Sequence, residues 1–143
     1  MSVGFRSGAI WTEVGDSDFL HAFFSTICFH LEANNWGSKF PYLQKKLYYD
    51  ALDSKEAISA LEELKEIQNR FSALKPEDVV WDVEDLTKKP PMEFFSNNNA
   101  TTLAECFIIV GKKNLISRLI EILEFCIRRG ISVKIQRESD LIN

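Results

Sequence analysis

Two histidines and three cysteines carry the most reactive side chains, and their spacing limits the chemistry available to them. His21 and His30 are nine positions apart, so they do not share a helix face as an i, i+4 pair of metal ligands would. Cys28 and His30 are two positions apart, and on a helix they would point about 200° away from each other. A nucleophile and its base must instead lie within hydrogen-bond reach. We therefore predict no catalytic residue, no bound metal and no cofactor.

Other catalytic motifs are missing as well. The sequence contains no G-x-S-x-G, no P-loop and no G-x-G-x-x-G, so a glycine loop that binds phosphate is not supported. The cysteines are odd in number and lie in apolar surroundings, which favours buried thiols over a disulfide framework.

Charge and hydropathy limit the class of partner. The 143-residue chain has 17 Lys and Arg against 21 Asp and Glu, a net charge of −4. Nucleic-acid binding depends on a cationic surface, for which this chain lacks the overall excess. No apolar run reaches the roughly 18 residues of a membrane span, and the first residues lack the apolar core of a signal peptide. We expect a cytoplasmic protein with no nucleic-acid or membrane partner.

The most distinctive stretch is an acidic segment, residues 77–86, in which half of the residues are acidic. Apolar residues alternate with the acids, which predicts a short strand with Val79, Trp81 and Val83 on one face and Asp82 and Glu84 on the other. Three interpretations compete. The segment could be a solvated edge that discourages aggregation, a docking face for a basic partner, or a metal or acid–base site.

The remaining pattern predicts a single domain over residues 1–143. We expect two short strands between Val3 and Val14, a helix ending near Glu32, a helical piece from Phe40 to Tyr49, and a third helix from a capping box at Asp53 to about Leu74. The acidic segment, an apolar run at 107–110, a helix over 115–129 with Gly130 after it, and a strand at 131–135 complete the order ββααα-β-β-αβ. This order indicates an α/β (α+β) fold in two layers, with helices packed on a small mixed sheet. We expect the tail after about residue 136 to be frayed.

Four stretches carry a resemblance to a known family. They are residues 7–20 (SGAIW through GDSDFL), residues 23–32 (FFSTI with HLE), residues 37–41 (GSKFP), and residues 80–86 (VWDVEDL) followed by Pro90-Pro91. In this order and spacing the chain resembles the immunity protein 70 family of bacterial polymorphic toxin systems. The resemblance implies a small cytosolic protein, encoded beside a toxin, that binds and neutralises that toxin, and it implies no catalytic residues.

The charge and the resemblance together predict a cognate toxin domain that is basic. We expect neutralisation by occlusion of the toxin's active site or substrate path. The expected toxin-binding residues are Asp82, Glu84 and Asp85, with Glu77 and Asp78 as outer charges. Trp81 could be a core anchor or an interface anchor, of which we favour the core, and Trp36 is the better candidate for an exposed aromatic contact. The alternative is a small cytosolic enzyme or ligand-binding regulator that uses a pocket between helices and sheet. A pocket lined by Tyr42, Tyr48 or Tyr49 together with the acidic segment would support it. The sequence leaves the oligomeric state open.

Overall fold

A four-stranded antiparallel sheet forms one layer of the protein. The computed structural model describes residues 2–96 and 99–142. Strands β1 (Ser2–Ser7) and β2 (Ile10–Asp16) form a hairpin, and the turn between them places Gly8 at φ 61°, a left-handed conformation that glycine adopts without steric cost. Strand β6 (Val133–Arg137) pairs with the other side of β1, and β3 (Ala51–Leu52) pairs with β6, which gives the order β2-β1-β6-β3.

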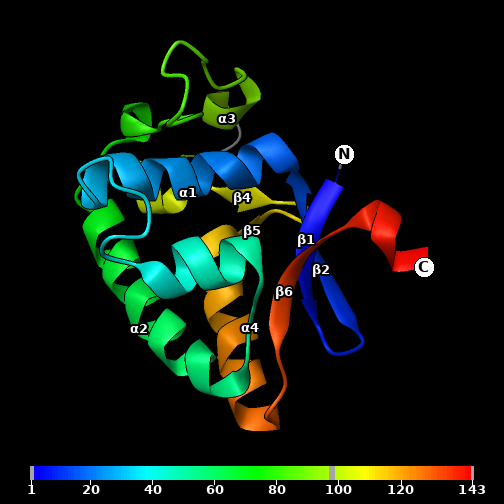
Figure 1. Ribbon diagram of the computed structural model, residues 1–143. Helices are drawn as coiled ribbons and strands as arrows, with labels where there is room; N and C mark the ends of the chain where they lie inside the picture. Colours follow the sequence, from blue (N-terminus) through cyan, green and yellow to red (C-terminus); the bar gives the residue numbers. More distant parts are fainter. Residues whose placement is uncertain (1, 97–98, 143) are drawn as a thin grey trace.

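The long helices lie on one face of this sheet (Figure 1). They are α1 (Ser17–Leu31), the π-helix η1 (Tyr42–Leu47), α2 (Ser54–Phe71) and α4 (Leu115–Arg129). The predicted capping box at Asp53 is present, because its side chain accepts from Glu56 N while the Glu56 carboxylate accepts from Asp53 N. Gly130 ends α4 in the left-handed conformation, with φ 66°, as the sequence predicts.

The core lies between the sheet and the helices. The stripe predicted for the last helix is buried at Leu119 and Leu123, and α2 packs against α4 over much of its length. Phe23 on α1 makes edge-on contacts with Phe24, Phe71 and Phe107. Such contacts add to the stabilisation from apolar burial.

Short elements connect the long ones. They are the 3₁₀ turns η2 (Pro76–Asp78), η3 (Leu103–Glu105) and η4 (Glu138–Ile142), the single-turn helix α3 (Glu93–Ser96), and a two-stranded hairpin of β4 (Ile108–Ile109) and β5 (Lys113–Asn114). The β4–β5 hairpin lies beside β2, where Val110 N donates to Val14 O at 3.1 Å.

Three details differ from the expectations. Every strand pair in the described residues is antiparallel, so the sheet is not mixed. The strand predicted over 79–83 is wrong, because these residues are irregular; their backbone groups bond to α1 and to nearby side chains instead of to another strand. After residue 136 the chain continues β6 to Arg137 and then forms η4, in which Gln136 Nε2 donates to Asp140 O. The predicted domain also includes residues 1, 97, 98 and 143, which lie outside the described residues.

Candidate functional site

The acidic segment belongs to a longer excursion of the chain, residues 77–95, which we call the acidic loop. It runs from η2 to α3 and lies across α1, on the side of α1 that faces away from η1 (Figure 1). It contains six of the 21 acidic residues and two of the 17 basic residues. The loop therefore carries the whole net charge of −4, and the rest of the chain, with 15 residues of each sign, is neutral.

The start of the loop is bound to α1 through backbone hydrogen bonds. Val80 N donates to Thr26 Oγ1 at 3.0 Å, and the Thr26 hydroxyl donates to Ala22 O at 2.7 Å within its own helix. One turn further along α1, His30 Nε2 donates to the carbonyl oxygen of Asp78 at 2.6 Å. Thr26 is fully buried, so its hydroxyl is held in a fixed place, and together the two contacts to the loop fix where it crosses the helix.

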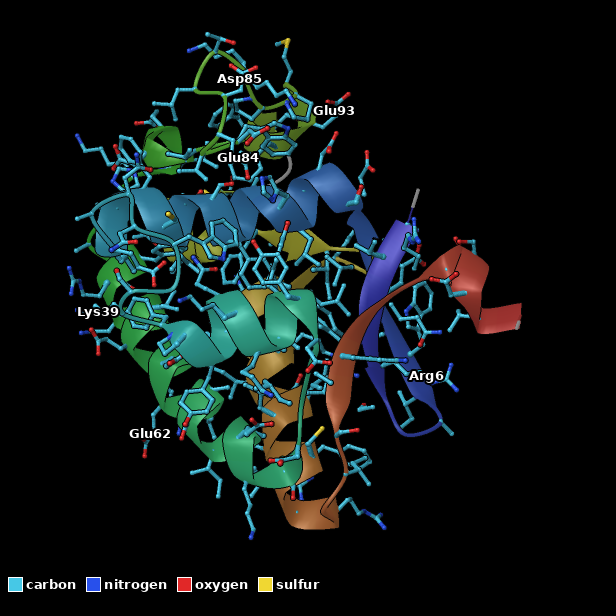
Figure 2. All side chains as sticks on the ribbon, in the orientation of Figure 1. Arg6, Lys39, Glu62, Glu84, Asp85 and Glu93 are labelled. Carbon is cyan, nitrogen blue, oxygen red and sulfur yellow. The ribbon has the colours of Figure 1, made fainter. Side chains whose placement is uncertain are left out.

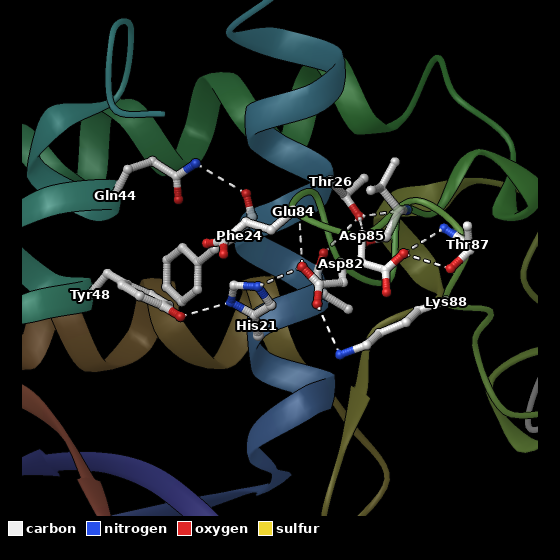
Figure 3. Close-up of polar contacts among 12 residues, drawn as sticks. His21, Phe24, Thr26, Gln44, Tyr48, Asp82, Glu84, Asp85, Thr87 and Lys88 are labelled. Carbon is white, nitrogen blue, oxygen red and sulfur yellow. Dashed lines mark hydrogen bonds and ion pairs between the residues drawn. The ribbon is translucent and has the colours of Figure 1, made fainter. Parts of the chain in front are cut away.

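The middle of the loop is bound through the Asp82 carboxylate (Figure 3). Asp82 accepts from Glu84 N at 2.9 Å, forms an ion pair with Lys88 at 3.2 Å, and lies 3.4 Å from His21 Nε2. Burial acts to raise the pKa of Asp82, but the Glu84 N–H, Lys88 and His21 together lower it below its usual value. Asp82 is therefore ionised at neutral pH, with its charge directed at the protein's own groups.

His21 connects the acidic loop to η1 and its neighbour Tyr48. Its Nδ1 lies 2.7 Å from the Tyr48 hydroxyl, while its Nε2 faces Asp82 (Figure 3). Burial, followed by the nearby Tyr49, Glu84 and Asp82, raises the pKa of Tyr48, so its hydroxyl keeps its proton. Because both ring nitrogens of His21 face protein partners, this arrangement favours a positioning role over acid–base chemistry on a substrate.

The end of the loop is bound by an aromatic contact. Phe94 on α3 is buried and packs against Phe19 of α1, Phe107 and Trp81 at ring-centroid distances of 6.5, 5.3 and 6.0 Å. Trp81 is half-buried by this contact and by the core behind it, which agrees with its assignment as mainly a core residue. The loop thus meets the domain through polar contacts at its start and middle and through apolar packing at its end.

The predicted contact residues differ in how free their side chains are. The Asp78 carboxylate accepts from Lys75 N, and the Asp85 carboxylate accepts from Thr87 N. The Thr87 hydroxyl and N–H lower the pKa of Asp85. In the described residues no ion pair includes Glu77 or Glu84. The side chains of Asp85 and Glu93 lie at the outer end of the loop, whereas Glu84 lies beside α1 (Figure 2), where its side chain is nevertheless exposed.

Trp36 is packed more closely than the sequence suggests. Its ring stacks on His21 and meets Tyr48 edge-on, and its Nε1 donates to Gln44 O at 2.7 Å. The indole is half-buried rather than fully exposed. The His21 ring on which it stacks is also the ring that faces Asp82.

The turn that carries Trp36 is organised by a buried carboxylate, which the sequence analysis missed. Glu32 is 3% exposed and accepts from the backbone N–H groups of Gly37, Lys39 and Phe40 and from Gln44 Nε2. Four donors directed at one carboxylate satisfy its hydrogen-bonding needs without an ion pair.

Exposed apolar side chains on the acidic loop were also missed. Eight large apolar side chains are exposed in the described residues, and Leu86, Met92 and Phe95 of the loop are three of them. Leu86 and Phe95 line a groove of about 320 Å³. Its other lining residues are Glu77, Val79, Val80, Trp81, Lys88, Lys89 and Pro90. The sequence offers one indication: these residues lie beside Pro90-Pro91, outside any helical or alternating pattern that would bury them.

No three His, Cys, Asp or Glu side chains converge on a point that could hold a metal ion in residues 2–96 and 99–142. Over the same residues, none of the helices combines the length and the apolar character needed to cross a membrane.

Comparison with known proteins places the chain in a family. The family model described as Immunity protein 70 matches residues 5–135, so the chain belongs to the immunity protein 70 family, and the resemblance drawn from the sequence is confirmed. Its role is that of an immunity protein, whose partner is a toxin. Neither a curated protein nor a solved structure matches the chain.

Proposed function

We propose that this protein neutralises a basic toxin domain by binding it through the acidic loop and covering the toxin's active site or substrate path. The toxin would belong to a bacterial polymorphic toxin system and be encoded beside this protein. Binding would take place in the cytoplasm, without catalysis and without a nucleic-acid or membrane partner. The observation that carries the proposal is the location of the entire net charge on one projecting loop of an otherwise neutral immunity protein.

The acidic loop suits fast capture of a basic partner. Complementary charge mainly raises the association rate, because the attraction acts before contact. Glu77 and Glu84 have no ion-pair partner in the described residues, so their charge remains available to a partner. Asp78, Asp82 and Asp85 add to the same field, although their carboxylates also bond to the loop itself.

The test is a matched pair of charge reversals. Glu84→Lys changes the loop, and Glu62→Lys makes the same change of net charge on an exposed residue of α2, far from the loop (Figure 2). Association with the purified toxin domain encoded beside this protein's gene would be measured at two salt concentrations. We expect Glu84→Lys to slow association about 3- to 10-fold and to weaken its salt dependence, since salt screens such attraction over about 8–10 Å.

Glu62→Lys should change the association rate less than about 2-fold, because Glu62 lies on α2, away from the loop (Figure 2), and salt weakens the effect of distant charges. Equal slowing by both variants would mean that overall charge matters and the loop does not. If the wild-type protein neither binds this toxin nor protects cells that produce it, the proposal is wrong, and the alternative of a small enzyme or ligand-binding regulator takes its place.

A further inference from the structure

The groove in the acidic loop has the shape and lining of a binding site for a side chain. Its volume is about 320 Å³, at the small end of the roughly 300–1,000 Å³ typical of ligand pockets. Val79, Val80, Trp81, Leu86 and Phe95 supply apolar walls. A groove of this size and lining suits one apolar side chain of a protein partner better than a large organic ligand.

The walls of the groove are fixed before any partner arrives. The Val80 backbone is bound to the buried Thr26 hydroxyl. Trp81 and Phe95 both pack edge-on against Phe94, at centroid distances of 6.0 and 5.2 Å. A preformed groove loses little conformational entropy on binding, which is the condition under which apolar contacts contribute most to affinity.

The acidic loop around the groove favours one sign of charge on the partner. Glu77 lies on the rim, and Asp85 and Glu84 precede Leu86 in the chain. Lys88 and Lys89 also line the groove, and the Lys88 ammonium group is paired with Asp82 at 3.2 Å. The whole acidic loop has six acidic residues against two lysines. The loop that carries the groove is therefore net negative, and it favours positive residues on the partner on either side of the apolar side chain that enters the groove.

We propose that the groove binds one aromatic or aliphatic side chain from a Lys- or Arg-rich segment of the toxin, and that this contact determines how long the complex lasts. The inference rests on the proposed function and deepens it. Central apolar contacts that exclude water provide most of the binding energy in typical interfaces, whereas rim charges mainly affect association. Leu86 and Phe95 are accordingly the contact residues, and Glu77 and Glu84 are the steering residues. Trp81, which is half-buried against Phe94, forms a fixed wall of the groove.

The experiment compares equally exposed apolar residues. Leu86→Ala and Phe95→Ala alter the groove, while Ile58→Ala is the control, because Ile58 is 49% exposed on α2 and Leu86 is 55% exposed. Binding of the toxin domain encoded beside this gene would be measured by kinetics, with a thermal melt for each variant. We expect the two groove variants to bind about 10- to 100-fold more weakly through faster dissociation, with unchanged salt dependence, and Ile58→Ala to bind within about 2-fold of wild type.

The outcomes separate this inference from the proposed function. If the wild-type protein binds and neutralises the toxin but Leu86→Ala and Phe95→Ala dissociate as slowly as wild type, the groove inference is overturned and the proposed function stands. If the wild type does not bind at all, both are overturned. Should Phe95→Ala unfold because of its contact with Phe94, Leu86→Ala alone decides, since no aromatic packing depends on it.

A second measurement tests the chemistry of the occupant. Met92 is 85% exposed on the same loop, so p-benzoylphenylalanine placed at this position should cross-link to the toxin in the complex. Attachment within a segment that joins an apolar residue to flanking Lys or Arg supports the inference. Attachment within an acidic or uncharged segment overturns it.

Discussion

The helix pair α2–α4 and the acidic loop are stabilised in different ways. The helix pair is regular, and its apolar stripes are buried at every turn, with Leu64, Ile67, Leu119 and Leu123 fully enclosed. The acidic loop contains little regular structure and contacts the domain through Thr26, His30, Asp82 and Phe94. Stability that is spread over many contacts belongs to the domain as a whole, whereas stability from a few contacts can be lost locally.

The largest effect should come from the helix pair. Leu119→Ala or Leu123→Ala should lower the free energy of unfolding by about 2–5 kcal/mol, because each residue is completely buried and its truncation leaves a cavity. Chemical denaturation of the two variants provides the measurement. A loss below about 1 kcal/mol in both would mean that this stripe is not part of a tightly packed core.

Phe94→Ala should have a smaller global effect and a larger local one. A fully enclosed Phe costs about 3–5 kcal/mol when truncated, but the loop can detach while the rest stays folded, so we expect a global loss of about 1–3 kcal/mol. Cys106 is buried close to Phe94 and Trp81, whereas Cys126 is buried within α4. Burial raises the pKa of both thiols, for Cys106 to about 11, so labelling requires an opening of the structure.

Thiol labelling therefore separates local from global opening in this variant. In Phe94→Ala, Cys106 should react faster with a thiol reagent than in wild type, and Cys126 should react at nearly the wild-type rate. Equal acceleration at both cysteines would show that the loop and the helix pair open together. The loop would then not be able to open locally while the helix pair stays folded.

The two regions also differ in how far the sequence predicts them. For α2, the capping box at Asp53 and the helical spacing of the apolar residues are enough to predict the helix, because both depend on residues within one or two turns of each other. For the loop, the alternation at Val79, Trp81 and Val83 indicates two faces but not which group satisfies the backbone. That group is Thr26, more than 50 positions away in the chain, while the Asp82 and Asp85 side chains bond to backbone groups two residues on, a local pattern that competes with a strand.

The candidate site was also predicted only in part. Its acidic residues are evident from the sequence, because the charge of a residue follows from its type alone. Its groove could not be predicted, because the exposure of Leu86 and Phe95 depends on where Phe94 is buried. A sequence without a periodic pattern around these residues does not state which of two adjacent phenylalanines faces the core.

Two carboxylates, one in each region, should respond to pH with opposite signs. Glu63 on α2 accepts from the N–H groups of Tyr42 and Leu43 at the start of η1. Burial nevertheless raises its pKa to about 7 from the model-peptide value of 4.5. Between these two values the folded state binds more protons than the unfolded state, so the stability contributed by protonated Glu63 is lost as the pH rises through about 7.

The variant Glu63→Gln isolates this contribution. A fully buried group with such a shift would change stability by roughly 3 kcal/mol, and solvent screening of the half-buried Glu63 reduces this to about 1 kcal/mol. Denaturation at several pH values from 4.5 to 7.5 should show a smaller decline in the variant than in wild type. An identical decline in both proteins would assign the pH dependence to other groups.

Asp82 should give the smallest effect, with the opposite sign. Its pKa is lowered in the folded state, so its stabilising contribution is present above the unfolded value of about 4 and is lost as the pH falls through the folded pKa. Asp82→Asn should therefore cost up to about 1 kcal/mol at pH 7 and less in acid, since its partners Lys88 and His21 lie near the surface.

Glu84→Gln is the matched control for Asp82→Asn. It removes the same charge two positions further along the chain, from a side chain that is exposed. We expect it to change the free energy of unfolding by less than about 0.5 kcal/mol. If the loop is positioned by Asp82 and steers a partner through Glu84, Asp82→Asn should also speed hydrogen exchange at Val80 N–H, and Glu84→Gln should leave it unchanged. The two variants would then separate the charge that positions the loop from the charge that it presents. Equal exchange in both would mean that Thr26 and Phe94 suffice to position the loop, and Asp82 would rejoin Glu77 and Glu84 as a residue available to the toxin.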